Sequence, residues 1–388
     1  MKIGGFMYKN LFASVALVAG LGLCAGASAA DIPKSTQKSL DELKLGADAL
    51  NGLDAELAVP QAWIDGARAE KEAIISGTWE PKEFRDMTAP FRERYPFVNL
   101  KYERSGTAGR GMQVLVALGE GRVVVDVVTS LADAVFEYME AKALAPLQEL
   151  PTYKAIDAKY RAADGTWISH KLSYRCMAYN TDTVKKADLP ATWEDLVNNP
   201  RWAGGKLALT NNPSTWLLGL WGDKGEKWGE EFTKALFEKL KPQRRKEGLT
   251  ALTGLTVAGE FDMSLPSPEW VAERYAKKGA PLGYHCPSPV PITVSGIAII
   301  DKSPRKNAAR LFVNWLESKE GQIVQYTTTL AVPVHKDLQD PRFVPFADTI
   351  VGKPANVRDD ALLLSDTNKK MGDLWDSYWT SGVAGTKP

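Results

Sequence analysis

The sequence predicts an α/β protein with two lobes and mixed, mostly parallel sheets. Two observations carry this prediction. Short apolar strands alternate with amphipathic helices from about residue 67 onward, and strand–helix–strand repetition places helices on the faces of a mostly parallel sheet. The chain is also long: without a 30-residue leader, about 358 of the 388 residues remain. That length exceeds one ordinary hydrophobic core and favours two lobes.

The alternation is clearest in the first third of the chain. An apolar strand is expected at 73–77 and a helix at 81–95. An alternating strand at 97–102 leads through a Gly-containing break to an apolar-periodic helix at 112–118, and an apolar strand follows at 123–128.

The rest of the chain continues in the same way. Strands are expected at 175–179, 206–210 and 292–300, and helices at 193–198, from Trp216 onward and at 306–325. Residues 31–60 are polar and helix-prone, which predicts an N-terminal helical extension. The last fifty residues are expected to be helical and peripheral.

The first thirty residues have the features of a secretory signal peptide. Lys2 and Lys9 precede an apolar run at 11–19, and small residues occupy the end of the segment. Cleavage is expected near Ala29 and Ala30, which predicts a mature protein in the periplasm.

Two alternatives to cleavage stay open. The uncharged stretch at 11–30 is nearly long enough to anchor the chain in a bilayer. Cys24 could carry a lipid, although Leu23 precedes it where the lipoprotein signal prefers a small residue.

Charge composition argues against nucleic acid and anionic membranes as main partners. The chain has 48 Lys and Arg, of which two lie in the leader, so 46 basic residues face 47 acidic ones. Such a balance provides no basic surface for phosphate backbones.

The numbers and spacing of cysteine and histidine argue against a zinc site, and no cofactor is expected. The mature chain has two cysteines, Cys176 and Cys286, which form either a disulfide or two free buried thiols. The three histidines, His170, His285 and His335, are far apart in sequence, and no metal-ligand spacing occurs.

Six local patterns, in order along residues 61–334, resemble the extracellular solute-binding proteins of ABC importers, especially the group of ferric-iron and related small-ligand binders. They are the helix at 63–71, Ser105-Gly106-Thr107-Ala108-Gly109, Asp126-Val127-Val128-Thr129-Ser130, Ala178-Tyr179-Asn180-Thr181-Asp182 with the helix start at 189–196, Arg201-Trp202-Ala203-Gly204-Gly205-Lys206, and the late helix at 306–322.

This resemblance implies the type II periplasmic-binding-protein fold, with two lobes, hinge strands, a ligand in the interlobe cleft and a C-terminal helical region. The implied parts are the leader at 1–30, the extension at 31–60, lobe 1 at 61–173 and 296–335, lobe 2 at 174–295, and the helical region at 336–388. The chain would cross between lobes near 174–178 and 293–298, so that a disulfide between Cys176 and Cys286 beside the hinge is conceivable.

Ligands of open α/β sheets bind beyond the carboxyl ends of strands, where loops lead into helix N-termini. Free N–H groups and hydroxyls there favour an anionic or phosphorus-containing solute. Side chains with this placement, or just before the returning strand, are the candidate ligand contacts: Thr78, Trp79, Ser105, Gly106, Thr107, Ser130, Ser214, Thr215, Trp216, Tyr284 and His285. Helix capping by Ser and Thr, and core packing by Trp, are the alternatives.

Two further hypotheses concern iron and signalling. Ferric-iron members of the resembled group carry adjacent tyrosines, whereas this chain has no Tyr-Tyr pair, and Tyr284-His285 is the nearest approach to one. Ferric iron therefore stands as an alternative to an organic anion, and a ligand sensor built on the same fold is another.

No catalytic residues are expected. The chain lacks the Gly-x-Ser-x-Gly elbow, the phosphate-binding P-loop and the Rossmann glycines. Ser303 and Lys306 match a Ser-x-x-Lys pattern, but they begin a helix, where Ser is an ordinary cap. The sequence thus predicts a monomeric binding protein that delivers a small solute to a membrane permease, and not an enzyme.

Overall fold

The computed structural model describes Met1 and residues 32–105, 109–130, 135–350, 352–355 and 360–380. The predicted signal peptide lies outside the described residues. None of the helices described here combines the length and apolar character needed to cross a membrane.

One mixed sheet of nine strands runs through the described residues, in the order β2-β1-β3-β9-β4-β7-β5-β6, with β8 paired to β4. Pairs β1–β2, β1–β3, β5–β6 and β5–β7 are parallel, and every pair that involves β4 or β9 is antiparallel. The strands are β1 (Glu72–Gly77), β2 (Asn99–Arg104), β3 (Val127–Thr129), β4 (Ile168–Asn180), β5 (Leu207–Thr210), β6 (Gln243–Arg245), β7 (Met263–Pro268), β8 (Leu282–His285) and β9 (Ile292–Ile299).

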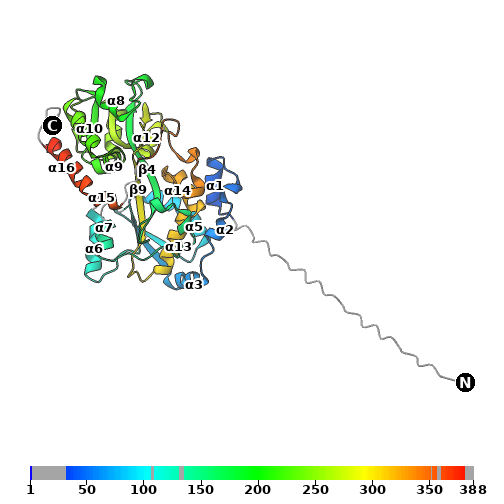
Figure 1. Ribbon diagram of the computed structural model, residues 1–388. Helices are drawn as coiled ribbons and strands as arrows, with labels where there is room; N and C mark the ends of the chain where they lie inside the picture. The colour runs from blue at the N-terminus through cyan, green and yellow to red at the C-terminus, as the bar shows by residue number, and fades with distance from the viewer. Residues whose placement is uncertain (2–31, 106–108, 131–134, 351, 356–359, 381–388) are drawn as a thin grey trace.

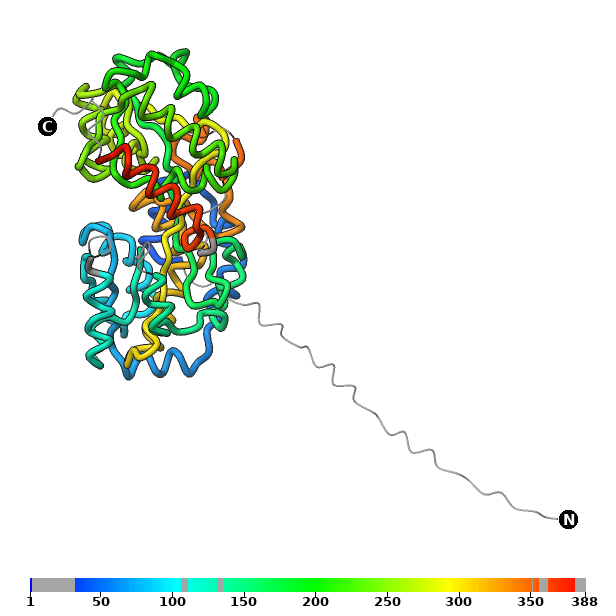
Figure 2. The backbone as a smooth tube through the Cα atoms, turned by 60° about the vertical axis from the view of Figure 1, so that its left-hand side comes forward, coloured from blue at the N-terminus to red at the C-terminus, as the bar shows by residue number. Residues whose placement is uncertain are grey.

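The molecule has two halves that β4 and β9 connect (Figures 1 and 2). We call the half with β1–β3 lobe 1 and the half with β5–β8 lobe 2. Strand β4 has 13 residues, which at about 3.3 Å per residue makes it long enough to serve both halves. Its residues 168–174 pair with β9, whereas residues 175–180 pair with β7 and β8. The lobe boundaries implied by the resemblance fall near these two strands.

Helices cover the sheet in both lobes. Their buried faces form separate cores, around Phe91 and Phe312 in lobe 1 and around Trp193 and Leu265 in lobe 2. The helices are α1 (Lys34–Glu42), α2 (Leu53–Glu56), α3 (Gln61–Glu70), α4 (Pro81–Met87), α5 (Ala89–Arg94), α6 (Gly109–Gly119), α7 (Val135–Glu140), α8 (Trp193–Asn198), α9 (Leu217–Lys224), α10 (Glu226–Glu238), α11 (Leu249–Val257), α12 (Glu269–Ala276), α13 (Lys306–Glu317), α14 (Lys319–Thr329), α15 (Asp360–Leu363) and α16 (Asp366–Thr380).

Two helices predicted as continuous are each divided in two. The segment at 81–95 breaks at Thr88, because Pro90 in the first turn of α5 has no N–H to continue the α4 ladder. The segment at 306–325 breaks at Ser318, whose hydroxyl accepts the N–H of Gly321 and begins α14 as an N-cap.

The strand predicted at 123–128 is shorter than expected, and β3 begins only at Val127. The cause is Asp126, whose buried carboxylate accepts the N–H of Ile74 at 2.7 Å and the side chains of Ser303 and Arg305. This residue ties the strand to the start of the late helix, a structural role that its position predicts.

The N-terminal extension is helical and packs on lobe 1. Leu40 and Leu53 contact Ile323 in one buried cluster. Thr36 donates to the buried Glu320 carboxylate, which also binds Arg94 at 2.6 Å. The extension is therefore held to α14 by both apolar contacts and an ion-pair network.

The C-terminal region was expected to be peripheral, but α16 completes the core of lobe 2. Trp375 is fully buried beside Phe237, and Met371 belongs to the same cluster. The correction has a simple physical reason: one face of α16 carries aromatic side chains, and packing them against the apolar core of lobe 2 removes them from water.

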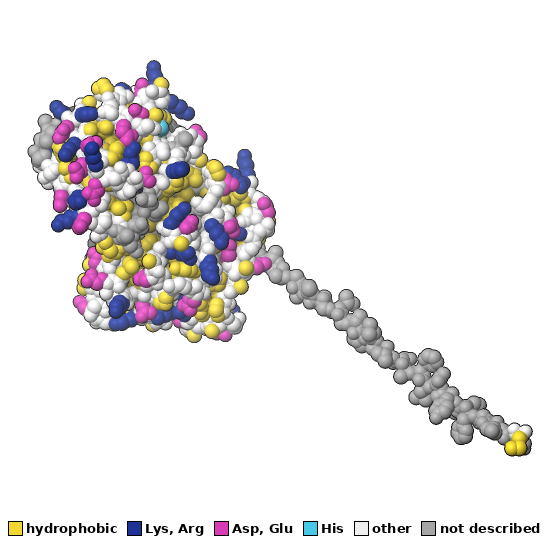
Figure 3. All heavy atoms as spheres, in the orientation of Figure 1, with side chains coloured by type: hydrophobic (Ala, Val, Ile, Leu, Met, Phe, Trp, Pro, Cys, Tyr) yellow, Lys and Arg dark blue, Asp and Glu magenta, His cyan; other side chains and the backbone are white. Residues whose placement is uncertain are grey.

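Both signs of charge are interspersed over the face of the molecule seen in Figure 3. The even composition of the sequence therefore appears on this face as a mixed surface.

Candidate functional site

A cavity of about 680 Å³ lies where the two lobes meet the connecting strands. Lobe 1 contributes Thr78 and Ser130 from loops after β1 and β3, and lobe 2 contributes the loop after β5 and the start of α11. The rest of the wall includes residues of β4 and β9, Val135 of α7, Trp167, Pro268, Trp270 and Leu363 of α15. A solute of this size range would touch both lobes at once.

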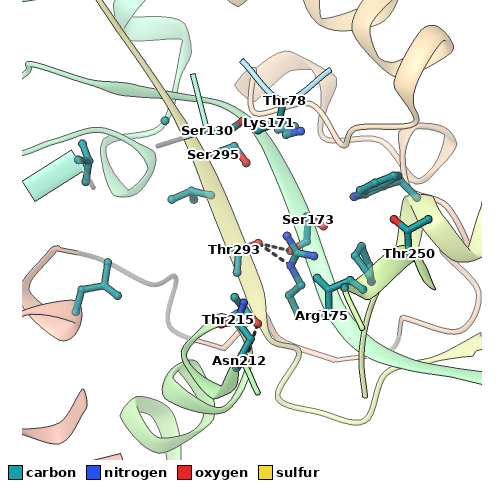
Figure 4. Close-up of a pocket in the computed structure, with 18 of the residues that line it drawn as sticks. Thr78, Ser130, Lys171, Ser173, Arg175, Asn212, Thr215, Thr250, Thr293 and Ser295 are labelled. Atoms are coloured by element: carbon teal, nitrogen blue, oxygen red, sulfur yellow. Dashed lines mark hydrogen bonds between the residues drawn. The ribbon is translucent and has the colours of Figure 1, made fainter. Parts of the chain in front are cut away.

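The strand β4 presents three polar side chains to this cavity. Lys171, Ser173 and Arg175 alternate along the strand, so they share one face of it. In the antiparallel register, Lys171 faces Ser295 and Ser173 faces Thr293 on β9. Figure 4 shows these side chains spread along β4 and β9, with Lys171 near Thr78 and Arg175 near Thr293.

A shift in the pairing of β4 with β9 determines which side chains of β4 face the cavity. The register between β4 and β9 shifts between Ser169 and Lys171, and the hydroxyl of Ser169 donates to the carbonyl of Lys171. Because side chains alternate with a period of two, one extra residue decides which set faces the cavity. The shift therefore directs Lys171, Ser173 and Arg175 inward.

The two cations are only weakly compensated. Arg175 Nε donates to Thr293 Oγ1 at 3.0 Å. Lys171 has no side-chain hydrogen bond or ion pair within the described parts of the chain. Burial lowers the pKa of Lys171 to about 8, with the Arg175 charge acting in the same direction. Among the described residues that line the cavity, none is Asp or Glu.

A buried carboxyl, Glu269, lies behind these cations at the start of α12. It is 0% exposed, and one of its oxygens accepts the hydroxyl of Ser173 at 2.9 Å, whereas the other has no partner. Burial raises the pKa of Glu269 to about 7, although the Arg175 charge opposes this. At neutral pH the carboxyl is thus partly protonated, and it cancels only part of the positive charge of Lys171 and Arg175.

The affinity for an anion of fixed charge, such as a sulfonate, is expected to fall roughly tenfold as pH rises from about 6 to about 9. Ionisation of Glu269 near pH 7 adds a negative charge behind the site, and deprotonation of Lys171 near pH 8 removes a positive one. Calorimetric titration across this range checks the trend. In Glu269→Gln only the Lys171 step should remain, and it should lie at a lower pH than in the wild type, because the Glu269 charge raises the pKa of Lys171. An affinity that is flat or rises with pH contradicts the assignment.

Lobe 1 contributes two hydroxyls from strand ends. Ser130 adopts a left-handed backbone conformation with φ of 57°, and its N–H donates to the carbonyl of Gly296 at 2.8 Å. Its hydroxyl has no partner in the described structure. Positive φ in a residue other than Gly is costly and is often found at binding sites. The turn thus directs Ser130 toward the space that Thr78 also lines.

Three of the residues predicted to contact ligand line the cavity: Thr78, Ser130 and Thr215. Gly106 and Thr107 lie outside the described residues. These three lining residues follow strand ends, as the sequence rule expects, and they come from loops of both lobes.

The two predicted tryptophan contacts are corrected, because both side chains are buried in the protein. Trp79 is 3% exposed and packs against His170 with ring centroids 5.2 Å apart. Trp216 is 1% exposed and packs against Trp193 in the core of lobe 2. These indoles fill the cores of the lobes, in agreement with the alternative that tryptophans at such positions pack in the core.

Four other predicted contacts also fall outside the cavity wall. The hydroxyls of Ser105 and Ser214 donate to Gly77 and Asn212. Tyr284 is fully buried and donates to the carbonyl of Ser267, while the His285 ring lies 2.7 Å from the carbonyl of Pro190. Hydrogen bonds within the protein account for these four side chains without a ligand.

Sequence analysis missed the connecting strands as a source of cavity-lining residues. The missed side chains are Lys171, Ser173, Arg175, Thr293 and Ser295. A signal was present, since cations and hydroxyls alternate with apolar residues within a strand that is otherwise buried. Two basic side chains in such a strand need an anionic partner.

Cys176 and Cys286 form a disulfide in the structure, with Sγ atoms 2.01 Å apart and Cα atoms 5.1 Å apart. The pairing of Met177 with His285 across β4 and β8 brings the two cysteines opposite each other. The bond lies directly beside Arg175, where β4 passes from one lobe to the other.

A group of potential metal ligands, Glu56, His335 and Asp337, lies outside the cavity at the base of the N-terminal extension. The ammonium group of Lys319 is 3.0 Å from Asp337 and 3.8 Å from Glu56, and Glu56 Oε1 lies 3.0 Å from His335 Nε2. These groups satisfy one another, so the cluster is an ion-pair network.

Comparison with known proteins identifies the family. A family model described as bacterial extracellular solute-binding protein matches residues 76–323. An Fe(3+)-binding periplasmic protein of Serratia marcescens is 26% identical over 220 residues, which are 54% of this chain and 63% of that protein. The match therefore spans less than two thirds of that relative's length.

Solved structures show the same fold. Iron-bound HitA from Pseudomonas aeruginosa has a TM-score of 0.62 at 22% identity, covering 79% of this chain and 99% of that one. AfuA from Actinobacillus pleuropneumoniae, with fructose-6-phosphate bound, has a TM-score of 0.63 at 18% identity, covering 80% and 99%. At these identities the likeness concerns the fold alone. The matched family model covers more than half of the sequence, and the chain belongs to the bacterial extracellular solute-binding proteins.

Proposed function

We propose that this protein is the periplasmic receptor of an ABC-type importer, and that it captures a small anionic solute between its lobes. The observation that carries the proposal is the pair of cations on one face of β4, Lys171 and Arg175, without a carboxylate among the described lining residues. Hydroxyls from both lobes and both connecting strands surround them. An anion would supply the charge that this surface lacks.

The proposed mechanism is lobe closure. A solute in the cavity touches loops of lobe 1 and lobe 2 at the same time, so bound solute favours the arrangement in which the lobes lie close together. The closed receptor would then dock on a membrane permease and release the solute there. We propose that the leader at residues 1–30 is removed on export and that the protein acts as a monomer without catalysis.

Ferric iron is the alternative that the relatives raise, and the cavity disfavours it. A hard trivalent cation requires phenolate, carboxylate or similar oxygen ligands. The described lining residues include no Tyr, His, Asp or Glu, and Lys171 and Arg175 would repel the ion. Anion capture is therefore the better-supported function.

The test is thermal unfolding and calorimetry of residues 31–388, stripped of carried-over ligand, with phosphonates, phosphate esters, carboxylates, polyamines, thiamine and ferric salts. An anion at a hundredfold excess over its Kd should add about 2.7 kcal/mol of stability. Stabilisation by ferric salts or polyamines alone would overturn the proposal.

An ion pair between the lobes provides a second prediction. Arg274 on α12 of lobe 2 lies 2.5 Å from Glu83 on α4 of lobe 1. Both side chains are partly exposed, so the pair is worth about 1 kcal/mol or less, and its loss should raise the open population up to roughly fivefold. Small-angle scattering of the ligand-free Glu83→Gln and Arg274→Gln variants should show a larger radius of gyration. The charge-swapped double variant should recover the wild-type value; unchanged scattering in both single variants would mean that the pair does not hold the lobes.

A further inference from the structure

The cavity has two chemically distinct parts on the two faces of β9. Thr293 and Ser295 face Lys171 and Ser173 on one side, whereas Val294 and Gly296 point to the other. Both faces of β9 reach the cavity because β3 runs beside only part of β9. Strand β3 ends at Thr129, which pairs with Ile297, so the residues of β9 that precede Ile297 are not covered by β3.

The second face is apolar. Val135 of α7, Trp167 and Val294 belong to one hydrophobic cluster of lobe 1. The Trp167 ring lies against Gly296, where an added Cβ would come within 3.3 Å of it. The absence of a side chain at Gly296 therefore lets an indole form part of the cavity wall.

Leu363 adds an apolar contribution to the wall from the C-terminal segment. The segment is attached to lobe 2, because Thr367 donates to the Glu226 carboxylate of α10 at 2.9 Å and Leu362 packs over Gly222. The family model ends at residue 323. This part of the wall thus lies outside the region that the family model describes.

Lobe 2 has apolar lining side chains as well, including Leu249, Pro268 and Trp270. In contrast, Asn212 is the only amide and no carboxylate or imidazole occurs among the described lining residues. A sugar would meet Ser and Thr hydroxyls on one part of the wall but would also bury polar groups against its apolar part, and an ammonium group would find no carboxylate among the described lining residues. An inorganic oxyanion would leave the apolar walls facing water.

We propose, building on the function proposed above, that the solute is an organic anion with an apolar body, aromatic or branched aliphatic, and that Leu363 is a residue that determines specificity for this body. The anionic head lies at Lys171 and Arg175. The body lies against the apolar wall formed by Val135, Trp167, Val294 and Leu363.

Matched probes test the proposal in the mature protein. Methyl and phenyl derivatives of one head group, as phosphonate, sulfonate and carboxylate pairs, differ only in the body, and glucose 6-phosphate provides a polar body. The phenyl member of at least one pair should bind about thirtyfold tighter than its methyl partner, and tighter than the sugar phosphate. Equal binding within every pair, or tighter binding of the sugar phosphate, overturns this inference while leaving anion capture intact. If no anion of any kind binds, the proposed function itself fails.

Two adjacent leucines provide matched variants. Leu363 lines the cavity, whereas Leu364 is 69% exposed and does not. Leu363→Gln should weaken phenyl binding about tenfold and change methyl binding less than twofold, and Leu364→Gln should change neither. Val294→Thr, which keeps the side-chain shape on β9, should repeat the selective loss if Leu363→Gln folds poorly. Equal effects of the cavity and control variants would overturn the role of Leu363.

Discussion

Replacing Lys171 by Met is expected to lower the affinity for an anionic solute by about tenfold to a hundredfold. Its side chain lines the cavity and makes no hydrogen bond or ion pair within the described structure, so its ammonium group is free to bind an anion directly. A hydrogen bond to a charged group is worth about 1.5–3 kcal/mol, which gives that range. Methionine keeps the apolar stem of the side chain, so packing along β4 should change little.

The control for this variant is Lys302→Met, which removes a lysine from the exposed surface of lobe 1. Both variants change the net charge equally, so any nonspecific effect of charge should appear in both. Calorimetric titration of one anion into the wild type, Lys171→Met and Lys302→Met distinguishes a specific contact at Lys171 from a nonspecific effect of net charge. Equal affinity in Lys171→Met and the wild type would show that the anion does not bind at β4.

Replacing Cys176 and Cys286 together by Ala is expected to lower the free energy of unfolding by about 3–5 kcal/mol. The disulfide closes a loop with a sequence separation of 110 residues. A crosslink over a loop of this length removes much conformational entropy from the unfolded chain, in the usual model. Both cysteines are buried, so Ala is preferred to Ser, whose hydroxyl would need a partner.

Denaturant unfolding of the variant and the wild type measures the loss. A reductant should lower the stability of the wild type toward that of the variant, and it should leave the variant unchanged, because the mature chain has no other cysteine. If reductant and substitution both leave the midpoint of unfolding in place, the bond contributes nothing measurable. The same preparations also show whether the disulfide affects the cavity. Because Cys176 is adjacent to the cavity-lining Arg175, the affinity for an anion should be compared before and after reduction.

Several elements of the fold could be predicted from local sequence because their patterns are complete within a short window. The strand at 73–77 and the helix at 193–198 carry their apolar residues, turn residues and caps in sequence. Strands β6, β7 and β8 were not predicted. Their edges and pairing depend on β4 and β5, which are distant in the chain.

For the cavity, a local rule anticipated three of the lining residues, and whether they contact a ligand stays a prediction. Thr78, Ser130 and Thr215 follow strands, and strand ends of a parallel sheet meet at one edge. The rule failed for Trp79 and Trp216, because whether an indole at such a place fills a core or faces a cavity depends on the elements packed against it.

The sequence by itself determined the α/β class, the family and the strand-end loops, because apolar periodicity, turn residues and ordered motifs are properties of neighbouring residues. Only the tertiary structure decided that Lys171 and Arg175 face an interlobe cavity, since their direction depends on the register between β4 and β9, which are more than a hundred residues apart. It also decided that Leu363 reaches the same cavity and that Trp375 completes the core of lobe 2. The physical reason is the same in each case: the environment of a side chain is set by long-range packing, which a local pattern does not contain.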